Sequence, residues 1–486
     1  MKKLFAILLT VCMIALSAFS VAADATEVTT VGYSADRITA VDLDDVYNIK
    51  YCEDLLTHYP EYKITDADGL KLLSSLVNSG DAFSGVTIYL ANDINMTDVT
   101  GFLPIGKGNF AFQGTFDGQG HAINNLKMTL DNDYYYADGS TNKAPIGLFG
   151  CVAQNGVVKN LILGEGCEIK CDGSGLIWET YVGSIAGMLK TGAVIDNCYN
   201  MAKVSGGKAT GGIVGYGANG DHVIKNCTNV GTLSYKEGTN WTKESGGQCT
   251  IGGILGTHQM GSTIVKNCRN AGAINGFGYS AGFGGAGGIV GRSAALNMTI
   301  EGCINNGAVN GGGNTTTTHS IAGGILGYGQ FDTSIKNCLN YGVLTAEEGG
   351  TGIVGMLFEN STTQALPTIT QENNEDKSLA DPAETDATLE AALLGTLTYD
   401  YTPNEGNELI PPELEWNGDG TDDTGTSKAP ETAKRPELTT APSTTEAPAT
   451  EAPAAEKKGC GSTVGGFAVI LLTVGAAVVG LKKKED

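Results

Sequence analysis

The sequence predicts an all-β solenoid, a parallel β-helix, and two observations carry this prediction. A glycine-rich pentad recurs along the chain, and a cysteine follows each of the later copies by 11 or 12 residues. Self-similarity at a spacing of about 20 to 50 residues means that each unit buries its apolar face only against its neighbours. The pentads occupy residues 183–187, 211–215, 252–256, 287–291 and 323–327, with an earlier copy at 146–150, and the cysteines are Cys198, Cys227, Cys268, Cys303 and Cys338.

The residues around each cysteine predict three short strands per turn. They are the pentad itself, an Ile-x-Asn-Cys segment and a Gly-x-Val segment. A β-branched residue precedes each cysteine by three positions, an asparagine follows it by two, and an aliphatic residue follows it by six. Parallel strands of successive coils lie about 4.8 Å apart, so equivalent side chains stack and the inward aliphatic residues form a continuous core. An asparagine at a turn can bond backbone groups and its copies above and below. That column is Asn200, Asn229, Asn270, Asn305 and Asn340.

The distance between successive cysteines varies from 29 to 41 residues. The excess falls between the cysteine frame and the next pentad, in excursions at 235–249, 276–285 and 311–319. Insertions on one side of each coil are typical of the side on which a solenoid meets its partner.

The segments before and after the repeats predict caps. Residues 66–78 have apolar residues at helical spacing behind an acidic start, which predicts a short capping helix. The alternating run at 86–90 predicts the first strand of the body. After residue 358 the pattern stops, and a polar C-terminal cap is expected at 359–417, with a short acidic helix at 378–394 and an edge strand at 409–416.

Both ends of the chain carry apolar runs. Residues 1–25 predict a secretory signal peptide: two lysines, an apolar run too short to span a membrane, and small residues near Ala22. Residues 464–481 form an uncharged apolar run followed by three lysines, which predicts a transmembrane anchor with a cytoplasmic tail at 482–486. Lipidation of Cys12 is disfavoured because the apolar run continues past it. Processing or lipidation of Cys460 stays open beside a retained membrane helix.

The composition restricts the classes of partner. The formal net charge is −23, and much of the acidic excess lies between Glu372 and Lys458. An acidic chain without a basic stripe repels phosphate backbones, so nucleic-acid binding is not expected. Residues 418–463 are rich in Thr, Pro, Ala and Glu, and predict an extended stalk between the caps and the membrane.

Together with the pentads and the Asn-Cys-x-Asn-x-Gly frames, the segment Phe112–His121 resembles the GLUG-motif repeats of bacterial surface proteins. The resemblance covers residues 86–358, with 26–85 as an N-terminal cap region. It implies a right-handed β-helix on the outside of a bacterium. In that family the repeats are accessory modules attached to surface anchors, adhesins or peptidases, and no catalytic domain is recognisable beside them here.

The cysteine column has two chemical interpretations besides packing. Zinc sites need clustered ligands at short spacing, whereas these cysteines lie one coil apart and no Cys-x-x-Cys occurs. We interpret the column as free thiols that pack as small apolar groups. A disulfide between Cys167 and Cys171 stays open as an alternative. No metal or cofactor site is predicted: Asp93, Asp117, Asp131 and Asp133 suit calcium, but turn-forming aspartates explain them better.

An enzyme is the alternative of a different class, because parallel β-helices include polysaccharide lyases and glycosidases. Such a site needs two or three carboxylates on adjacent coils, and Asp196 and Glu301 are the candidates. They belong to a charged column two residues before the cysteine frame, which we interpret as a solvated face of mixed sign. The column is Lys159, Asp196, Lys225, Lys266, Glu301 and Lys336. No catalytic motif is recognised, and no catalytic site is assigned.

The sequence therefore predicts an anchored, non-catalytic surface protein, an adhesin that binds glycans or host and neighbour-cell proteins. A passive surface scaffold is the third alternative. Aromatic rings stack on sugars and anchor protein interfaces, so the candidate contact residues are the aromatic residues of the excursions. They are Tyr134, Tyr135, Tyr136, Trp178, Tyr235, Trp241, Phe277 and Tyr279.

Overall fold

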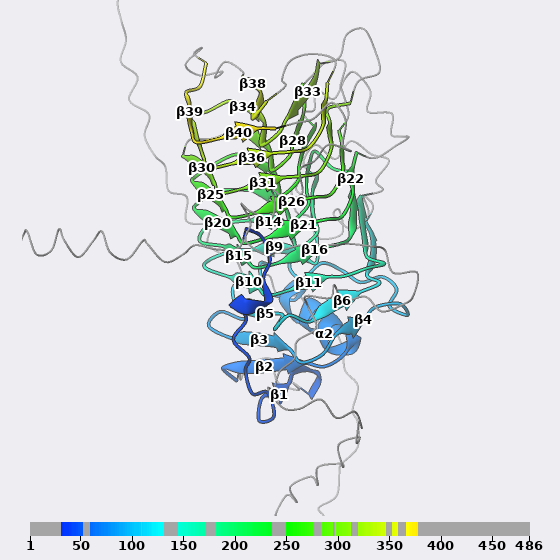
Figure 1. Ribbon diagram of the computed structural model, residues 1–486. Helices are drawn as coiled ribbons and strands as arrows, with labels where there is room; N and C mark the ends of the chain where they lie inside the picture. The colour runs from blue at the N-terminus through cyan, green and yellow to red at the C-terminus, as the bar shows by residue number, and fades with distance from the viewer. Residues whose placement is uncertain are drawn as a thin grey trace, which may run out of the picture. The chain divides into compact units, whose positions relative to one another are not determined.

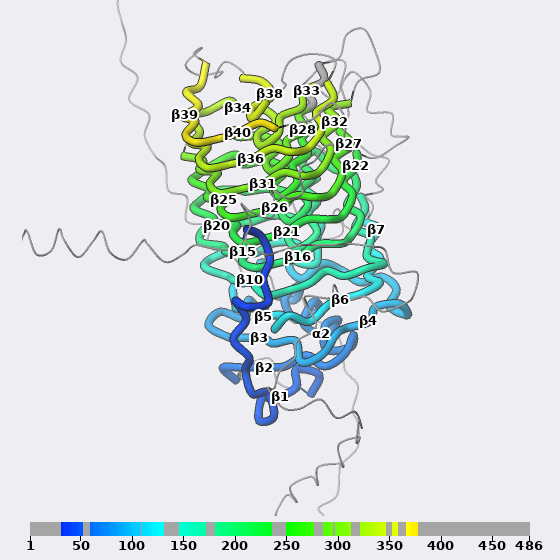
Figure 2. Tube along the Cα trace, in the orientation of Figure 1, coloured from blue at the N-terminus to red at the C-terminus, as the bar shows by residue number. Residues whose placement is uncertain are grey.

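Five long parallel sheets wind around one axis and make up the body of the protein, as seen in the computed structural model (Figure 1). The structure describes residues 31–51, 59–107, 109–130, 144–171, 180–235, 249–276, 283–294, 297–312, 319–346, 352–357 and 366–377. All of these belong to a unit spanning Met1–Gly418. The predicted all-β parallel solenoid is confirmed. The tube trace shows the coils stacked in chain order, from blue at the N-terminal end to yellow (Figure 2).

We number the sheets I to V in the order in which one coil passes through them. Sheet I consists of β1 (Tyr47–Asn48), β2 (Glu61–Ile64), β3 (Thr87–Leu90), β5 (Thr115–Asp117), β10 (Val157–Lys159), β15 (Val194–Asp196), β20 (His222–Lys225), β25 (Thr263–Lys266), β30 (Met298–Glu301), β35 (Thr333–Lys336) and β39 (Ile369–Glu372). Sheet II consists of β4 (Ile94–Asn95), β6 (Ala122–Asn124), β11 (Ile162–Leu163), β16 (Tyr199–Asn200), β21 (Thr228–Asn229), β26 (Arg269–Asn270), β31 (Ile304–Asn305), β36 (Leu339–Asn340) and β40 (Glu375–Asp376).

The other three sheets complete each coil. Sheet III consists of β7 (Lys127–Leu130), β12 (Glu168–Cys171), β17 (Lys203–Ser205), β22 (Leu233–Ser234), β27 (Ile274–Asn275), β32 (Val309–Asn310) and β37 (Leu344–Thr345). Sheet IV consists of β8 (Ala144–Ile146), β13 (Thr180–Gly183), β18 (Ala209–Gly211), β23 (Cys249–Gly252), β28 (Phe283–Gly287) and β33 (His319–Gly323). Sheet V consists of β9 (Phe149–Val152), β14 (Ala186–Leu189), β19 (Val214–Gly217), β24 (Leu255–His258), β29 (Val290–Ser293), β34 (Leu326–Gly329) and β38 (Val354–Leu357).

A coil has five strands, so the prediction of three was wrong, and the corners explain why. The residue before each cysteine of the column adopts a left-handed backbone, and it is asparagine in four coils, as at Asn197 (φ 50°) and Asn226 (φ 55°), and glycine at Gly302 (φ 60°). This conformation divides one expected strand between sheets I and II. Asparagine tolerates that conformation better than most residues. The pentad is also divided, because its first glycine ends a strand of sheet IV and its last two residues begin a strand of sheet V.

The pentad glycines are required by three close backbone approaches. A Cβ on Gly252 would lie 2.0 Å from the carbonyl oxygen of Leu255, which closes the turn between sheets IV and V. A Cβ on Gly256 would lie 2.7 Å from the amide nitrogen of Thr210 in the preceding coil. At the second position, a Cβ on Gly253 would lie 2.0 Å from the carbonyl oxygen of Gly288 in the next coil and 2.5 Å from the Asn270 Cγ. Glycine therefore recurs at these positions because neighbouring atoms leave little room for a Cβ, with Ser184 as the exception at the second position of one pentad.

The asparagine column of sheet II forms the predicted ladder. Each amide nitrogen donates to the side-chain oxygen one coil above, as from Asn229 to Asn270 and from Asn270 to Asn305, both at 2.8 Å, and the last, Asn340, donates to the Asp376 carboxylate. The same nitrogen donates to the carbonyl oxygen two residues ahead, as from Asn270 to Gly272 at 3.0 Å. The column is fully buried. The ladder therefore satisfies polar groups inside the solenoid that water cannot reach.

The N-terminal end contains the predicted capping helix, α2 (Ala67–Asn78). The Asp66 carboxylate accepts a hydrogen bond from the Gly69 amide at 3.0 Å, which caps the helix. Its buried residues, including Leu70 and Leu73, join the core of the first coils. Two short 3-10 helices, η1 (Ala35–Arg37) and η2 (Ile49–Tyr51), precede it.

Sheet I continues beyond both predicted limits of the repeat region. It begins at β1, before residue 86, and ends at β39, after residue 358. Among the described residues, no helix is long and apolar enough to span a bilayer. The predicted signal peptide at 1–25, the helix at 378–394, the edge strand at 409–416, the stalk, the anchor and the tail lie outside the described residues.

An N-terminal strap, residues 31–38, was not predicted. It runs along the outside of the coils (dark blue in Figure 2). The Gly32 amide donates to the carbonyl oxygen of Asn267 at 2.7 Å, and the Tyr33 amide donates to the Thr228 hydroxyl at 2.9 Å. The Ser34 amide donates to the Asn197 side-chain oxygen at 2.8 Å. The strap thus links three successive middle coils to the N-terminal cap.

Candidate binding face on sheet I

The outer face of sheet I carries two side-chain columns in register. From β5 to β39, the first outward residue of each strand is β-branched or a serine, and the second is charged. The first column is Thr115, Val157, Val194, Val223, Ile264, Thr299, Ser334 and Thr370. The residues between these columns point inward, as Ile195 and Ile224 do, and are fully buried.

The charged column forms a ladder of ion pairs between neighbouring coils. Its Nζ-to-carboxylate distances are 3.0 Å for Lys159–Asp117, 3.4 Å for Lys225–Asp196, 3.7 Å for Lys266–Glu301 and 3.2 Å for Lys336–Glu372. The predicted face of mixed sign is therefore present, and each of these carboxylates has a lysine beside it. Asp117 is the most buried member, and its Oδ1 also accepts from the Asn160 amide at 2.9 Å.

The two carboxylates considered for catalysis lie far apart on this ladder. Asp196 pairs in register with Lys225, Lys225 with Lys266, and Lys266 with Glu301. Three rungs of about 4.8 Å place their backbones about 14 Å apart. Glycosidase carboxyl groups are about 5 to 9.5 Å apart. The geometry therefore disfavours Asp196 and Glu301 as an acid–base or acid–nucleophile pair.

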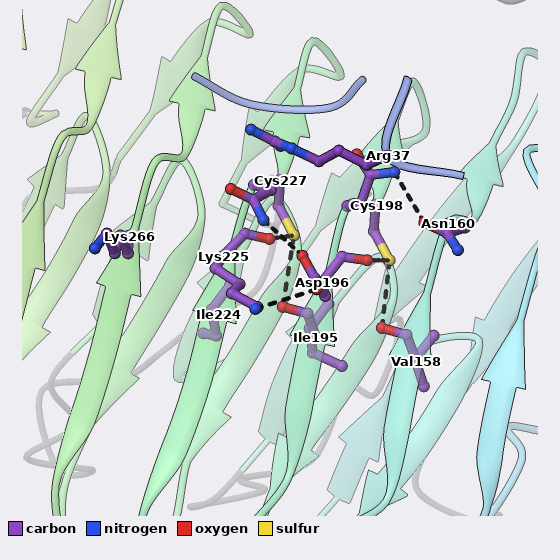
Figure 3. A network of polar contacts seen from close by, with 12 residues as sticks. Arg37, Val158, Asn160, Ile195, Asp196, Cys198, Ile224, Lys225, Cys227 and Lys266 are labelled. Carbon is purple, nitrogen blue, oxygen red and sulfur yellow. Dashed lines mark hydrogen bonds and ion pairs between the residues drawn. The ribbon is translucent and has the colours of Figure 1, made fainter. Parts of the chain in front are cut away.

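Behind the edge of this face lies the cysteine column, whose side chains point inward. Figure 3 shows the sulfur atoms of Cys198 and Cys227 directed at carbonyl oxygens of the preceding coil. Cys198 Sγ lies 3.7 Å from the Val158 oxygen, and Cys227 Sγ lies 3.9 Å from the Ile195 oxygen. Each sulfur also approaches the carbonyl two residues earlier, at 3.4 Å for Cys198 and 3.1 Å for Cys227. The same two contacts recur at Cys268, Cys303 and Cys338.

These thiols are structural groups. The five column cysteines are buried in the hydrophobic core, which confirms the predicted packing role. All nine cysteines of the described residues are buried and none forms a disulfide, so the structure does not contain the alternative bond between Cys167 and Cys171. Burial raises the pKa of the Cys198 and Cys268 thiols well above the ordinary value. The weak S–H donor at the corner between sheets I and II, which leucine at position 161 lacks, is the feature that sequence reasoning missed.

A shallow hollow of about 330 Å³ lies on the outer face near the C-terminal end of sheet I. It spans three coils, at the corner where the chain passes from sheet V into β30, β35 and β39. Asp332 fixes this corner, because its Oδ1 accepts the Thr368 amide at 2.7 Å. The hollow is lined by Asn297, Met298, Thr299, Asp332, Thr333, Ser334, Thr368 and Thr370. No sequence motif indicated it, since it depends on side chains brought together from three coils.

Of the aspartates considered as calcium ligands, Asp117 serves as a turn residue, because its Oδ1 accepts the Gln119 amide at 3.0 Å. Asp93 instead joins two coils, because its Oδ1 accepts the Ala122 amide, 29 residues ahead, at 2.9 Å. Asp131 and Asp133 lie outside the described residues. Within the described ranges, no group of three His, Cys, Asp or Glu side chains is placed to hold a metal ion.

Of the predicted contact aromatics, Tyr235 is the one that the structure describes, and it is not a surface residue. Only 6% of its surface is exposed, and it packs in the hydrophobic core. It follows β22 directly, so its side chain still continues the inward alternation of the strand. Tyr134, Tyr135, Tyr136, Trp178, Trp241, Phe277 and Tyr279 lie outside the described residues.

The long excursions all begin and end at one corner of the solenoid. Each joins a strand of sheet III to the next strand of sheet IV, as from β22 to β23 and from β27 to β28. One coil has a much shorter connection at this corner, because β17 and β18 are joined by residues 206–208 alone. The positions where the excursions begin and end confirm the predicted clustering of insertions on one side of each coil.

Comparisons with known proteins identify no family. No family model matches the chain. No curated protein matches it either. Among solved structures, one similar chain is a Bacteroides ovatus protein provisionally described as an immunoglobulin A1 protease, with 20% sequence identity and a TM-score of 0.47. The match covers 73% of this chain and 92% of the other. The resemblance to GLUG-motif repeats stays a prediction.

Proposed function

We propose that the chain is a non-catalytic binding protein displayed on a bacterial surface, where it engages glycans or the surface proteins of a host or a neighbouring cell. The observation that carries this proposal is that the connections between strands are long at one corner of the coil and short at another. The corner between sheets III and IV takes up the long connections, while the corner between sheets IV and V stays tight in each described coil. Variable loops on a rigid repeating scaffold are typical of recognition proteins.

The ion-pair ladder supports a binding role over a catalytic one. Glycoside hydrolysis needs two carboxyl groups close enough to act on one bond. Asp196 and Glu301 lie three rungs apart, and each is engaged with a lysine of a neighbouring coil. The enzyme alternative predicts release of reducing ends from pectins or host glycans that is abolished by Asp196→Asn or Glu301→Gln. Release that survives both changes leaves no role for this pair.

The display on the cell surface is part of the proposal. It rests on the signal peptide at 1–25, the stalk at 418–463 and the transmembrane anchor at 464–481, and the expected right-handed winding rests on the resemblance to GLUG repeats. Protease treatment of intact cells tests the topology. We expect the repeats to be digested or released while the tail at 482–486 stays protected, and protection of the repeats would contradict surface display.

A loop exchange tests the binding role. Residues 236–248, between Tyr235 and β23, are replaced by the Gly-Gly-Lys sequence of residues 206–208, which already joins sheets III and IV in another coil. Cells displaying the full chain are tested on arrays of glycans and of host surface proteins. We expect the wild type to bind one class, and the shortened chain to fold and to lose affinity. No binding to either class would favour the passive scaffold.

A further inference from the structure

We propose that the hollow at β30, β35 and β39 is a binding site for a neutral saccharide, a proposal that rests on the proposed function and names its ligand class. We call it the hydroxyl hollow, defined by Asn297, Thr299, Asp332, Ser334, Thr368 and Thr370. Three outward hydroxyl groups stand in register on successive coils here, those of Thr299, Ser334 and Thr370.

The outer column of sheet I changes chemistry where the hydroxyl hollow begins. From β10 to β25 the column is aliphatic and ends in Ile264, which is 40% exposed. Thr299 follows Ile264 in register, and hydroxyl side chains occupy the remaining rungs. All of these positions face solvent on the same sheet, so packing does not explain the change. An aliphatic stripe that ends in hydroxyl groups suits a pyranose, because the faces of the ring present C–H groups while its hydroxyl groups project around the rim.

The hydroxyl groups of the hollow are available to a ligand. Within the described residues, the side chains of Thr299, Ser334 and Thr370 make no hydrogen bond to protein. Thr333, between them, differs: its hydroxyl turns inward and bonds the Ser293 hydroxyl at 2.8 Å and the Phe331 carbonyl at 3.0 Å. Neighbouring rungs are about 4.8 Å apart, so hydroxyls on two rungs can bond different oxygens of one pyranose ring.

Charge selects a neutral ligand over an anionic one. Asp332 is the one carboxylate that lines the hollow, and no lysine or arginine lines it. The nearest lysine of the same strand, Lys336, is paired with Glu372 at 3.2 Å. Recognition of uronate or sulfate groups needs unpaired cations. The chain's formal charge of −23 also repels polyanions.

The test uses the purified full chain and two kinds of probe, measured by calorimetry. A soluble neutral glucan and a soluble neutral mannan are compared with polygalacturonate and heparin. The variant Thr299→Val, Ser334→Ala, Thr370→Val removes three hydroxyls and keeps two β-branched side chains in their strands. The matched control is Thr115→Val, which makes the same change on the same column, away from the hollow.

We expect a neutral glycan to bind, the triple variant to weaken binding by at least about tenfold, and Thr115→Val to leave it unchanged, at a typical net cost of about a few-fold to tenfold per lost hydrogen bond. Thermal melting shows whether the triple variant folds, and single Thr→Val variants replace it if it does not. Equal affinity of the wild type and the hydroxyl variants overturns the site while leaving glycan binding intact. Preference for the anionic probes overturns the ligand class. Binding to host proteins but to no neutral glycan overturns the inference and leaves the proposed function standing.

Discussion

The asparagine ladder of sheet II and the charged ladder of sheet I have the same rung spacing and opposite surroundings. The asparagines, such as Asn270, are fully buried and bonded to the coils above and below. The charged residues, such as Lys266 and Glu301, are about a third exposed and joined in pairs of neighbouring coils. The comparison teaches that stacking like residues in register does not by itself determine how much a ladder stabilises the solenoid. What each rung contributes depends on whether water can replace its partners.

Removing one buried rung is expected to have the largest effect. Asn270→Ala leaves the Asn229 amide donor, the Asn305 amide oxygen and the Gly272 carbonyl without the partner they now have. At about 1–3 kcal/mol for each of the three orphaned groups, the free energy of unfolding should fall by about 3–9 kcal/mol. Chemical denaturation of the full chain measures this loss. Asn275→Ala, at an exposed asparagine of the same coil, is the control and should change little. A loss below about 1 kcal/mol at position 270 would mean that water enters the ladder.

The glycine that faces the ladder should come next. A Cβ at Gly253 would lie 2.0 Å from the Gly288 carbonyl oxygen and 2.5 Å from the Asn270 Cγ. The backbone must shift, so Gly253→Ala should destabilise the fold by about 1–3 kcal/mol, and hydrogen exchange should accelerate in the coils on either side. The first pentad has Ser184 at this position, where its hydroxyl donates to the Gly212 carbonyl. Ser184→Gly is therefore the milder companion variant, and a larger effect there than at Gly253 would contradict the close approach.

The two ladders also show what the sequence can predict. Asn200 to Asn340 recur at a fixed offset from the cysteines, so stacking and amide bonding follow from the pattern alone. The division of each coil into five strands does not, because it depends on left-handed backbone at residues such as Asn197, which a pattern of side chains does not reveal. The strap at 31–38 could not be predicted from the sequence for another reason. Its contacts, such as Tyr33 with Thr228, join residues nearly 200 positions apart and occur once, so no periodic pattern indicates them.

The candidate site likewise has features that the sequence pattern predicts and features that it does not. The mixed charges of the ladder could be read from the cysteine frame, whereas the pairing of Lys266 with Glu301 needed the register. The hydroxyl hollow needed side chains from three coils, and loop aromatics were a poor guide where they can be checked, since Tyr235 is core. The residues that line the hollow come from three coils only, so no periodic pattern in the sequence indicates it.

The contrast between buried and exposed polar groups also predicts a pH-dependent stability, because one buried side chain, His222, can take up a proton. His222 is 1% exposed, with Nε2 2.7 Å from the Ala218 carbonyl oxygen, and burial lowers its pKa below the ordinary 6.5. As the pH falls below 6.5, the unfolded chain takes up the proton first, so stability should decrease until the folded-state pKa is reached and then level off. Denaturation midpoints between pH 8 and pH 5 measure the slope. His222→Thr, which copies Thr263 of the next coil, should flatten it, and an unchanged slope would assign the dependence to other groups.

The smallest effect is expected at the exposed ladder. Lys266 and Glu301 are 34% and 36% exposed and their charges lie 3.7 Å apart, so water and salt screen the pair. A double-mutant cycle with Lys266→Ala and Glu301→Ala should give a coupling of about 0–1 kcal/mol that shrinks at high salt. The same cycle at the more buried Asp117 and its partner Lys159, 3.0 Å apart, should give a larger value, since the Asp117 side chain is only 4% exposed. Equal coupling energies at the two pairs would show that burial does not determine how much an ion pair stabilises the fold. The different contributions of the two ladders would then have to come from the number of hydrogen bonds per rung alone.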